Sequence, residues 1–129
     1  RNNGIPEFIV EKTIRARERH HQSISMFYKA GGKIAMGTDA GTPFNVHGNN
    51  SQELQFMTDL GISNSDALRF STANAANLMG LEDRGQIQEG FFADLLIVSG
   101  NPVEDISAIV NQENHLCVVK NGVQVQKLV

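Results

Sequence analysis

Asp39 lies where an enzyme could use a carboxylate for acid–base or metal chemistry. It follows a short apolar run, residues 33–36, within the Gly-rich stretch Gly37-Thr38-Asp39-Ala40-Gly41-Thr42-Pro43. In α/β proteins, sites are built at the carboxyl ends of strands, where small neighbours let a ligand approach. A structural interpretation also stays open, in which Asp39 only caps the Thr42-Pro43 loop through backbone N–H groups. A single carboxylate needs partners for either kind of chemistry.

His47 is the second candidate, because its loop, Asn45-Val46-His47-Gly48-Asn49-Asn50, follows the predicted site strand. Loops carry function more often than cores do. Contact with a substrate and an ordinary loop role are both open for His47. The other histidines suggest structural roles: His20 at the surface, His21 half-buried on a helix, and His115 at the exposed edge of a strand. Adjacent helical residues point about 100° apart, so His20 and His21 cannot hold one metal together.

The composition narrows the classes of partner. The 129 residues suit one domain but cannot hold a complete (β/α)₈ barrel, which needs roughly 250 residues. The net charge of −3 and the lack of a basic cluster argue against nucleic acid. No apolar run approaches the roughly 18 residues of a membrane helix, so we expect no membrane partner. The single cysteine, Cys117, is predicted to be a buried strand thiol, which fits a reducing compartment and a cytoplasmic location.

Motifs for other chemistries are missing from the sequence. It has no Gly-x-Gly-x-x-Gly, no phosphate-binding Gly-rich loop with Lys, no Gly-x-Ser-x-Gly and no Cys-x-x-Cys. Nucleotide binding, serine hydrolysis and zinc-finger roles therefore lose support.

The first part of the chain is predicted to contain helices and one short strand. Residues 6–30 are predicted to be one helix that Gly31-Gly32 ends, and residues 33–36 a buried strand. Residues 42–50 should be loop. Ser51 is expected to cap a second helix that Gly61 ends. Ser63 and Asp66 have the spacing of a capping box, which predicts a third helix to about Leu78 or Met79.

The rest of the chain is predicted to consist mainly of short strands. We predict strands over residues 85–89 and 93–98, a turn and short helix from Pro102 to about Val110, and a hairpin of 115–120 with 123–128. Asn121-Gly122 is a strong signal for a type I′ hairpin turn. The chain thus has two predicted parts, residues 1–80 and 81–129. The start at Arg1 resembles an internal cut more than a natural beginning.

Three stretches, in this order, resemble the amidohydrolase superfamily. More narrowly, they look like its imidazolonepropionase-related branch, which includes prolidase-like dipeptidases. The stretches are residues 33–41 with Gly37-Thr38-Asp39-Ala40, residues 67–81 ending in Leu78-Met79-Gly80-Leu81, and residues 85–98 with Gly85-Gln86-Ile87 and Ala93-Asp94-Leu95. The resemblance covers nearly the whole chain, and the order of the three stretches makes it specific.

The resemblance implies an α/β fold that is the C-terminal part of a metal-dependent-hydrolase (β/α)₈ TIM barrel plus part of a small β-sandwich. Residues 1–80 would be the last barrel helices and strand, and residues 81–129 the sandwich part. Asp39 would be metal ligand and proton shuttle, and Asp94 only a turn or packing carboxylate. The metal would be divalent, with Zn²⁺ as the expected ion, one or two per full-length parent.

The resemblance is incomplete. This chain has no counterpart of several metal ligands of the family: the early His-x-His, the mid-barrel Lys or Glu, and two later His. The chain is therefore similar to the last quarter of such an enzyme. We expect it to be inactive alone and to pair with the missing N-terminal part or form a homo-oligomer.

The leading hypothesis is a parent hydrolase that cleaves a C–N bond in a small amide, dipeptide or cyclic amide, with Asp39 as catalytic residue and His47 contacting substrate. A noncatalytic amidohydrolase-like scaffold and a stand-alone α/β binding module are the alternatives.

Overall fold

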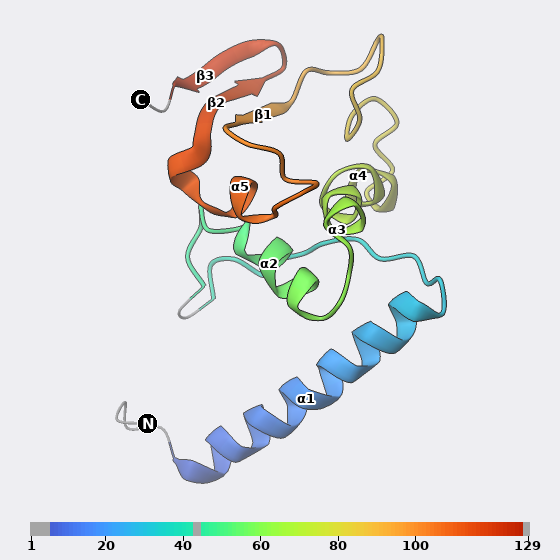
Figure 1. The fold of residues 1–129 in the computed structure, drawn as a ribbon, viewed down its shortest axis with the longest axis vertical. Coiled ribbons are helices and arrows are strands. Elements are labelled where there is room, and N and C mark those ends of the chain that lie inside the picture. The colour runs from blue at the N-terminus through green and yellow to red at the C-terminus, as the bar shows by residue number, and fades with distance from the viewer. Residues whose placement is uncertain (1–5, 43–44, 128–129) are drawn as a thin grey trace. The chain divides into compact units, whose positions relative to one another are not determined.

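The computed structural model describes residues 6–42 and 45–127, with side chains up to residue 125. Three predicted features lie outside the described residues. They are the start at Arg1, Pro43 of the Thr42-Pro43 loop, and residue 128, the last residue of the predicted hairpin. The chain divides into two compact units, residues 1–32 and residues 33–129 (Figure 1). The predicted division at residue 80 stays a prediction about the whole protein.

The first unit contains one helix, α1 (Glu7–Lys29), as predicted. Pro6 precedes it, and the Pro6 carbonyl accepts hydrogen bonds from the N–H groups of Ile9 and Val10 at 3.0 and 3.3 Å. Gly31 ends the helix in the left-handed region at φ 75°, where glycine has no steric cost. The N–H groups of Gly31 and Gly32 then close the last turn onto helical carbonyls.

Three short helices and their neighbours form the core of the second unit. They are α2 (Gln52–Asp59), α3 (Asn64–Ser71) and α4 (Ala73–Leu78), followed later by α5 (Ser107–Val110) and a 3₁₀ turn, η1 (Gln112–Asn114). The buried apolar side chains belong to these elements and the residues beside them: Leu54, Ile62, Ala67, Phe70, Ala76, Ile106 and Ala108. Burial of a side chain the size of Leu or Phe contributes about 1.5–3 kcal/mol, which applies here to Leu54, Ile62, Phe70 and Ile106.

The capping prediction for α3 is confirmed, and the one for α2 is wrong. The Asp66 N–H donates to Ser63 Oγ at 3.1 Å, as a capping box requires. Ser51 Oγ instead donates to the Val110 carbonyl at 3.2 Å, because α5 packs beside the start of α2. The predicted third helix is also divided, since Thr72 leaves helical geometry at φ −122°, ψ −92° between α3 and α4.

The sheet has three antiparallel strands in the order β1-β2-β3: β1 (Leu95–Val98), β2 (His115–Lys120) and β3 (Val123–Lys127). Asn121 and Gly122 join β2 to β3 with φ values of 50° and 78°, which confirms the predicted type I′ turn. Figure 1 shows α5 between this sheet and α2. Residues 85–89, predicted as a strand, belong to no strand of this sheet, because Gly85 turns the chain at φ 83° against α4.

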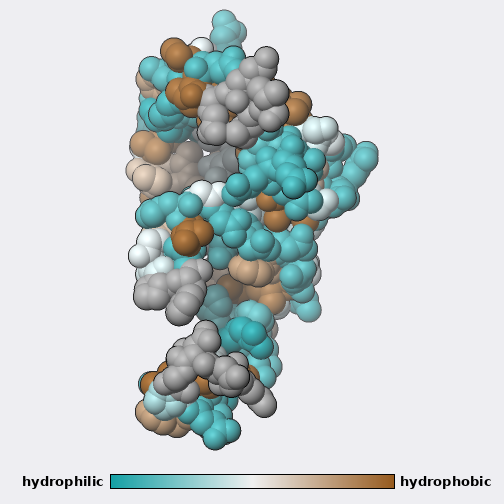
Figure 2. Space-filling view, turned by 90° about the vertical axis from the view of Figure 1, so that its left-hand side faces the viewer, coloured by the Kyte–Doolittle hydropathy of each residue, from teal (hydrophilic) through white to brown (hydrophobic). Residues whose placement is uncertain are grey.

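Exposed apolar side chains are dispersed over the molecule. On the face drawn in Figure 2, hydrophobic residues lie singly or in small groups among polar ones. Among the helices of the described residues, none is long and apolar enough to cross a membrane.

Candidate functional site

The segment before Asp39 is held by α3 and α4 instead of by a sheet. The Met36 N–H donates to the Phe70 carbonyl at 2.9 Å, and Asn74 Nδ2 donates to the Ile34 carbonyl at 2.7 Å. Residues 33–36 do not form the predicted strand in this structure, since a strand needs hydrogen bonds to a neighbouring strand and none lies beside them among the described residues. The barrel strand expected for the whole protein stays a prediction. These two hydrogen bonds nevertheless hold the segment that leads to Asp39 against α3 and α4.

Asp39 occupies an unusual backbone conformation at the end of this segment. Its φ is 51°, in the left-handed region that residues other than Gly rarely adopt. The Asp39 carbonyl accepts a hydrogen bond from Thr42 Oγ1 at 3.1 Å, and the residue is exposed. Its carboxylate makes no ion pair among the described residues, so the structure leaves it accessible to a ligand.

Asn45 closes the turn around Asp39. Its side-chain Nδ2 donates to the Thr38 carbonyl, and its backbone carbonyl accepts from the Gly41 N–H at 2.8 Å. The Asn45 N–H donates to the Thr42 carbonyl at 3.0 Å. One half-buried residue therefore bonds to the chain on both sides of Asp39.

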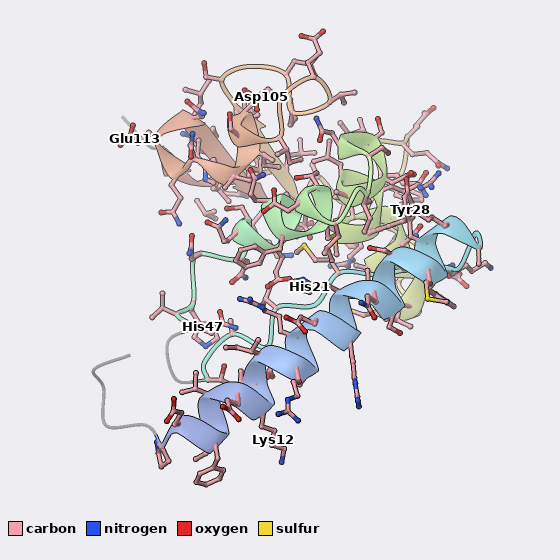
Figure 3. The ribbon with its side chains drawn as sticks, turned by 60° about the horizontal axis from the view of Figure 1, so that its bottom comes forward. Lys12, His21, Tyr28, His47, Asp105 and Glu113 are labelled. Carbon is pink, nitrogen blue, oxygen red and sulfur yellow. The ribbon has the colours of Figure 1, made fainter. Side chains whose placement is uncertain are left out.

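His47 lies against the same turn. Gly41 has φ 102°, and a Cβ there would lie 3.0 Å from His47 Nε2, so the glycine makes room for the imidazole ring. Figure 3 shows His47 on the loop that leads towards α2. The structure thus places the His47 ring against Gly41, two positions after Asp39, and both Asp39 and His47 are exposed. The catalytic and substrate-binding roles assigned to them stay predictions.

The remaining histidines and the cysteine are placed elsewhere. His20 is exposed on α1 as predicted. His21, labelled on the same helix in Figure 3, is also exposed, which corrects the expectation of a half-buried ring. None of the residues of α1 is buried. His115 begins β2 and is half-buried, not at an exposed edge, because its Nε2 lies 2.7 Å from the Ile109 carbonyl oxygen. Cys117 is a strand thiol as predicted, but it is only partly buried.

Asp94 has the structural role that was predicted for it. Its carboxylate accepts hydrogen bonds from Lys120 Nζ at 2.6 Å and from the Asn121 N–H at 2.8 Å, and it lies 3.6 Å from Arg84 Nη1. The Lys120 hydrogen bond, with that of Asn121, holds the pKa of Asp94 below its ordinary value. Asp94 directly precedes β1, and it therefore ties the start of β1 to the β2–β3 turn.

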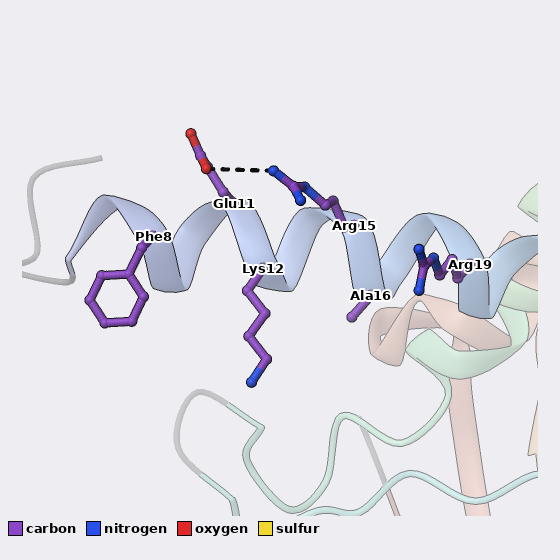
Figure 4. Close-up of a pocket in the computed structure, with 6 residues that line it drawn as sticks. All are labelled: Phe8, Glu11, Lys12, Arg15, Ala16 and Arg19. Carbon is purple, nitrogen blue, oxygen red and sulfur yellow. Dashed lines mark ion pairs between the residues drawn. The ribbon is translucent and has the colours of Figure 1, made fainter.

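One face of α1 forms a shallow depression, lined by Phe8, Glu11, Lys12, Arg15, Ala16 and Arg19 (Figure 4). Arg15 Nη2 and Glu11 Oε2 lie 3.8 Å apart on consecutive turns, and both side chains are exposed. Exposed pairs of this kind contribute little stability. Because a single helix supplies every lining residue, the depression does not have the converging groups of a catalytic site.

The described residues do not fit a catalytic metal ion by themselves. Within residues 6–42 and 45–127, no three His, Cys, Asp or Glu side chains come together in a way that could hold one. A catalytic zinc site normally has three protein ligands, and the Asp39 loop offers one carboxylate and one imidazole.

Sequence reasoning missed Asn45 and Asn74. Asn45 stood in a loop rich in Asn, where turn-forming asparagines are common, so its type alone carried no special signal. Asn74 lies 40 positions from its partner Ile34, and a contact of that range has no local pattern.

Comparisons with known proteins cover nearly the whole chain. Residues 1–125 match the Amidohydrolase family. An ochratoxinase from Aspergillus niger is 32% identical over 108 residues, which cover 81% of this chain and 22% of that protein. The structure of a Xaa-Pro dipeptidase with methionine bound in its active site matches with a TM-score of 0.84 and 35% identity, over 97% of this chain and 30% of the dipeptidase.

A second solved structure agrees with these matches. A prolidase complexed with N-methylphosphonate-L-proline matches with a TM-score of 0.82 and 26% identity, over 97% of this chain and 30% of that protein. The chain therefore spans less than a third of the length of each of these relatives.

Proposed function

Because this chain belongs to the Amidohydrolase family, we propose that the protein carrying it hydrolyses a C–N bond in a small amide, with Xaa-Pro dipeptides as the first substrates to test. The observation that carries the proposal is the match to a Xaa-Pro dipeptidase at 35% identity and a TM-score of 0.84. The match to a prolidase supports the same substrate class. The ochratoxinase match supports an amide substrate that is not a dipeptide as the next one to test.

Asp39 is the proposed catalytic carboxylate. Hydrolysis adds water to the carbonyl carbon, so that a C–O bond forms and the C–N bond then breaks. The attacking water must lose a proton and the leaving nitrogen must gain one. An exposed carboxylate on a turn of fixed backbone conformation can accept the first proton and donate the second.

His47 is the proposed substrate contact. Its ring lies against Gly41, two residues after Asp39, and this position in the same loop supports placing it beside a substrate bound at Asp39. A ring nitrogen of His47 can donate a hydrogen bond to a substrate carboxylate or carbonyl, which orients the scissile bond without taking part in proton transfer.

Amidohydrolases generally bind divalent metal ions. We place Asp39 as one ligand of such an ion, with one or two Zn²⁺ in the whole protein and the other ligands supplied from outside this chain. When bound, the ion would polarise the substrate carbonyl and lower the pKa of a water molecule.

The test is Asp39→Asn in the full-length protein, assayed by proline release from Xaa-Pro dipeptides. Loss of an acid–base group lowers kcat by about 10²–10⁴-fold. Asp59→Asn is the matched control, because Asp59 is exposed at the end of α2 and, among the described residues, its side chain accepts a hydrogen bond only from Gln55 of the same helix. Activity retained in Asp39→Asn would exclude the assigned role. A full-length protein that hydrolyses no amide would favour the noncatalytic scaffold.

A further inference from the structure

We propose that Asn45 is a positioning residue for the reaction, which holds the turn that presents the Asp39 carboxylate. The inference rests on the proposed function, because it gives Asn45 a role only through Asp39. This role requires that residue 45 has a side chain ending in an amide N–H donor that can reach the Thr38 carbonyl.

The hydrogen bonds of Asn45 enclose Asp39. The side-chain amide donates to the carbonyl of Thr38, the residue directly before Asp39. The backbone carbonyl of Asn45 accepts from the N–H of Gly41, two residues after Asp39, at 2.8 Å. Asp39 and Ala40 are thus the only residues between the two bonded positions. A rotation of the Asp39 backbone would break one bond or the other.

The conformation of Asp39 explains why such a clamp is needed. A φ of 51° lies in the left-handed region, which is sterically unfavourable for a residue with a Cβ, and a residue other than Gly stays there only when its surroundings hold it. Thr42 Oγ1 adds a hydrogen bond to the Asp39 carbonyl, and the Asn45 N–H in turn bonds to the Thr42 carbonyl. The clamp therefore acts on the backbone, and the Asp39 carboxylate makes no ion pair with any residue that the structure describes.

The chemistry of Asn45 suits this task better than related side chains. Its backbone N–H and carbonyl are both used within the turn, so only the side chain can reach Thr38. An aspartate carboxylate has no donor for the Thr38 carbonyl. Glutamine keeps the donor on a side chain that is one methylene longer and can fold back to the same carbonyl.

The experiment uses the full-length protein with three variants, Asn45→Ala, Asn45→Asp and Asn45→Gln, and proline release from Xaa-Pro dipeptides as the assay. A displaced reacting group costs up to about 10²-fold, so we expect kcat to fall about 10–100-fold in the Ala and Asp variants with a change in KM below about threefold. The Gln variant should keep kcat within about threefold, because it retains the donor. Rescue by Gln distinguishes positioning from a general loss of folded protein.

Asn77→Ala is the matched control, since Asn77 is exposed on α4 and its side chain makes no hydrogen bond among the described residues. Each variant is also heated, and a midpoint within about 3 °C of the unchanged protein shows that it folds. If Asn45→Ala fails to fold, the Asp and Gln variants decide. Full kcat in a folded variant without the donor, or equal losses in Gln and Ala, overturns the inference.

The Asp39→Asn variant separates this inference from the proposed function. If Asp39→Asn is inactive while Asn45→Ala and Asn45→Asp are fully active, only the role of Asn45 is lost. If Asp39→Asn is itself fully active, the proposed function fails whatever Asn45 does.

Discussion

Replacement of Gly85 by Ala should destabilise this fold more than the same replacement at Gly90. Both glycines have left-handed backbones, with φ values of 83° and 84°. They differ in their surroundings. A Cβ at Gly85 would lie 2.7 Å from the Cβ of Ala76 and 2.9 Å from the backbone carbonyl oxygen of Thr72, whereas a Cβ at Gly90 would meet nothing within 4 Å.

The magnitudes follow from these geometries. A Cβ in the left-handed region costs about 1–2 kcal/mol, and the reduced entropy of the unfolded chain returns about 0.4–1 kcal/mol. Gly90→Ala should therefore lower the free energy of unfolding by about 1 kcal/mol. Crowding against a packed backbone adds about 1–3 kcal/mol at Gly85, because Thr72 joins two helices and cannot move alone. Gly85→Ala should then cost about 2–4 kcal/mol.

Urea unfolding, followed by far-UV circular dichroism, measures both variants beside the unchanged chain. The decisive quantity is the difference between the free energies of unfolding of the two variants. Both glycines have nearly the same φ, so the cost of the left-handed backbone and the change in unfolded-state entropy are the same in both variants and cancel in this difference. Equal losses at Gly85 and Gly90 would refute the argument that close approach to α3 and α4 demands a glycine at position 85. A larger loss at Gly90 would refute it more strongly.

Three further outcomes are expected. In the full-length protein, His47→Ala should raise KM about 3–10-fold with little change in kcat, as for a lost substrate hydrogen bond, while His20→Ala changes neither. Because the folded pKa of Asp94 lies below its unfolded value of 3.8, its stabilisation is present above about pH 4 and lost as the pH falls through the folded pKa. The urea midpoint should therefore decrease as the pH is lowered below about 4, and this decrease should be smaller in Lys120→Met, which lacks the hydrogen bond to Asp94. Lys33→Met is the control and should show the same decrease as the unchanged chain. The 129-residue chain, purified and assayed for metal, should hold well under one Zn²⁺, and tight stoichiometric zinc would contradict this.

Features with local causes were predictable from the sequence. The capping box of Ser63 with Asp66 and the Asn121-Gly122 turn depend on residues at most three positions apart, and both are present in the structure. The helix over residues 6–30 needed only its own periodicity and the Gly31-Gly32 stop. The fold class is likewise confirmed by the match of this mixed helix and strand chain to amidohydrolase structures.

Features that depend on distant partners could not be predicted. Residues 33–36 have the composition of a strand, but a strand forms only beside another, and here α3 and α4 supply the hydrogen bonds. Ser51 has the type of a cap, yet α5 offers it the Val110 carbonyl from 59 positions away. At the candidate site, Asp39 and His47 were selected by residue type and loop position, whereas Asn45 became visible only through its bonds on both sides of Asp39.

The turn at Asp39 is built from short-range hydrogen bonds. The described bonds of Thr38, Asp39, Gly41 and Thr42 with Asn45 or with one another span seven positions or fewer. Its shape is therefore encoded within one short stretch of sequence, while the segment that carries it is docked by contacts of 34 and 40 positions. The conformation at Asp39 and the position of Asp39 in the fold thus have separate sources: substitutions within residues 38–45 would change the first, and substitutions in α3 or α4 would change the second.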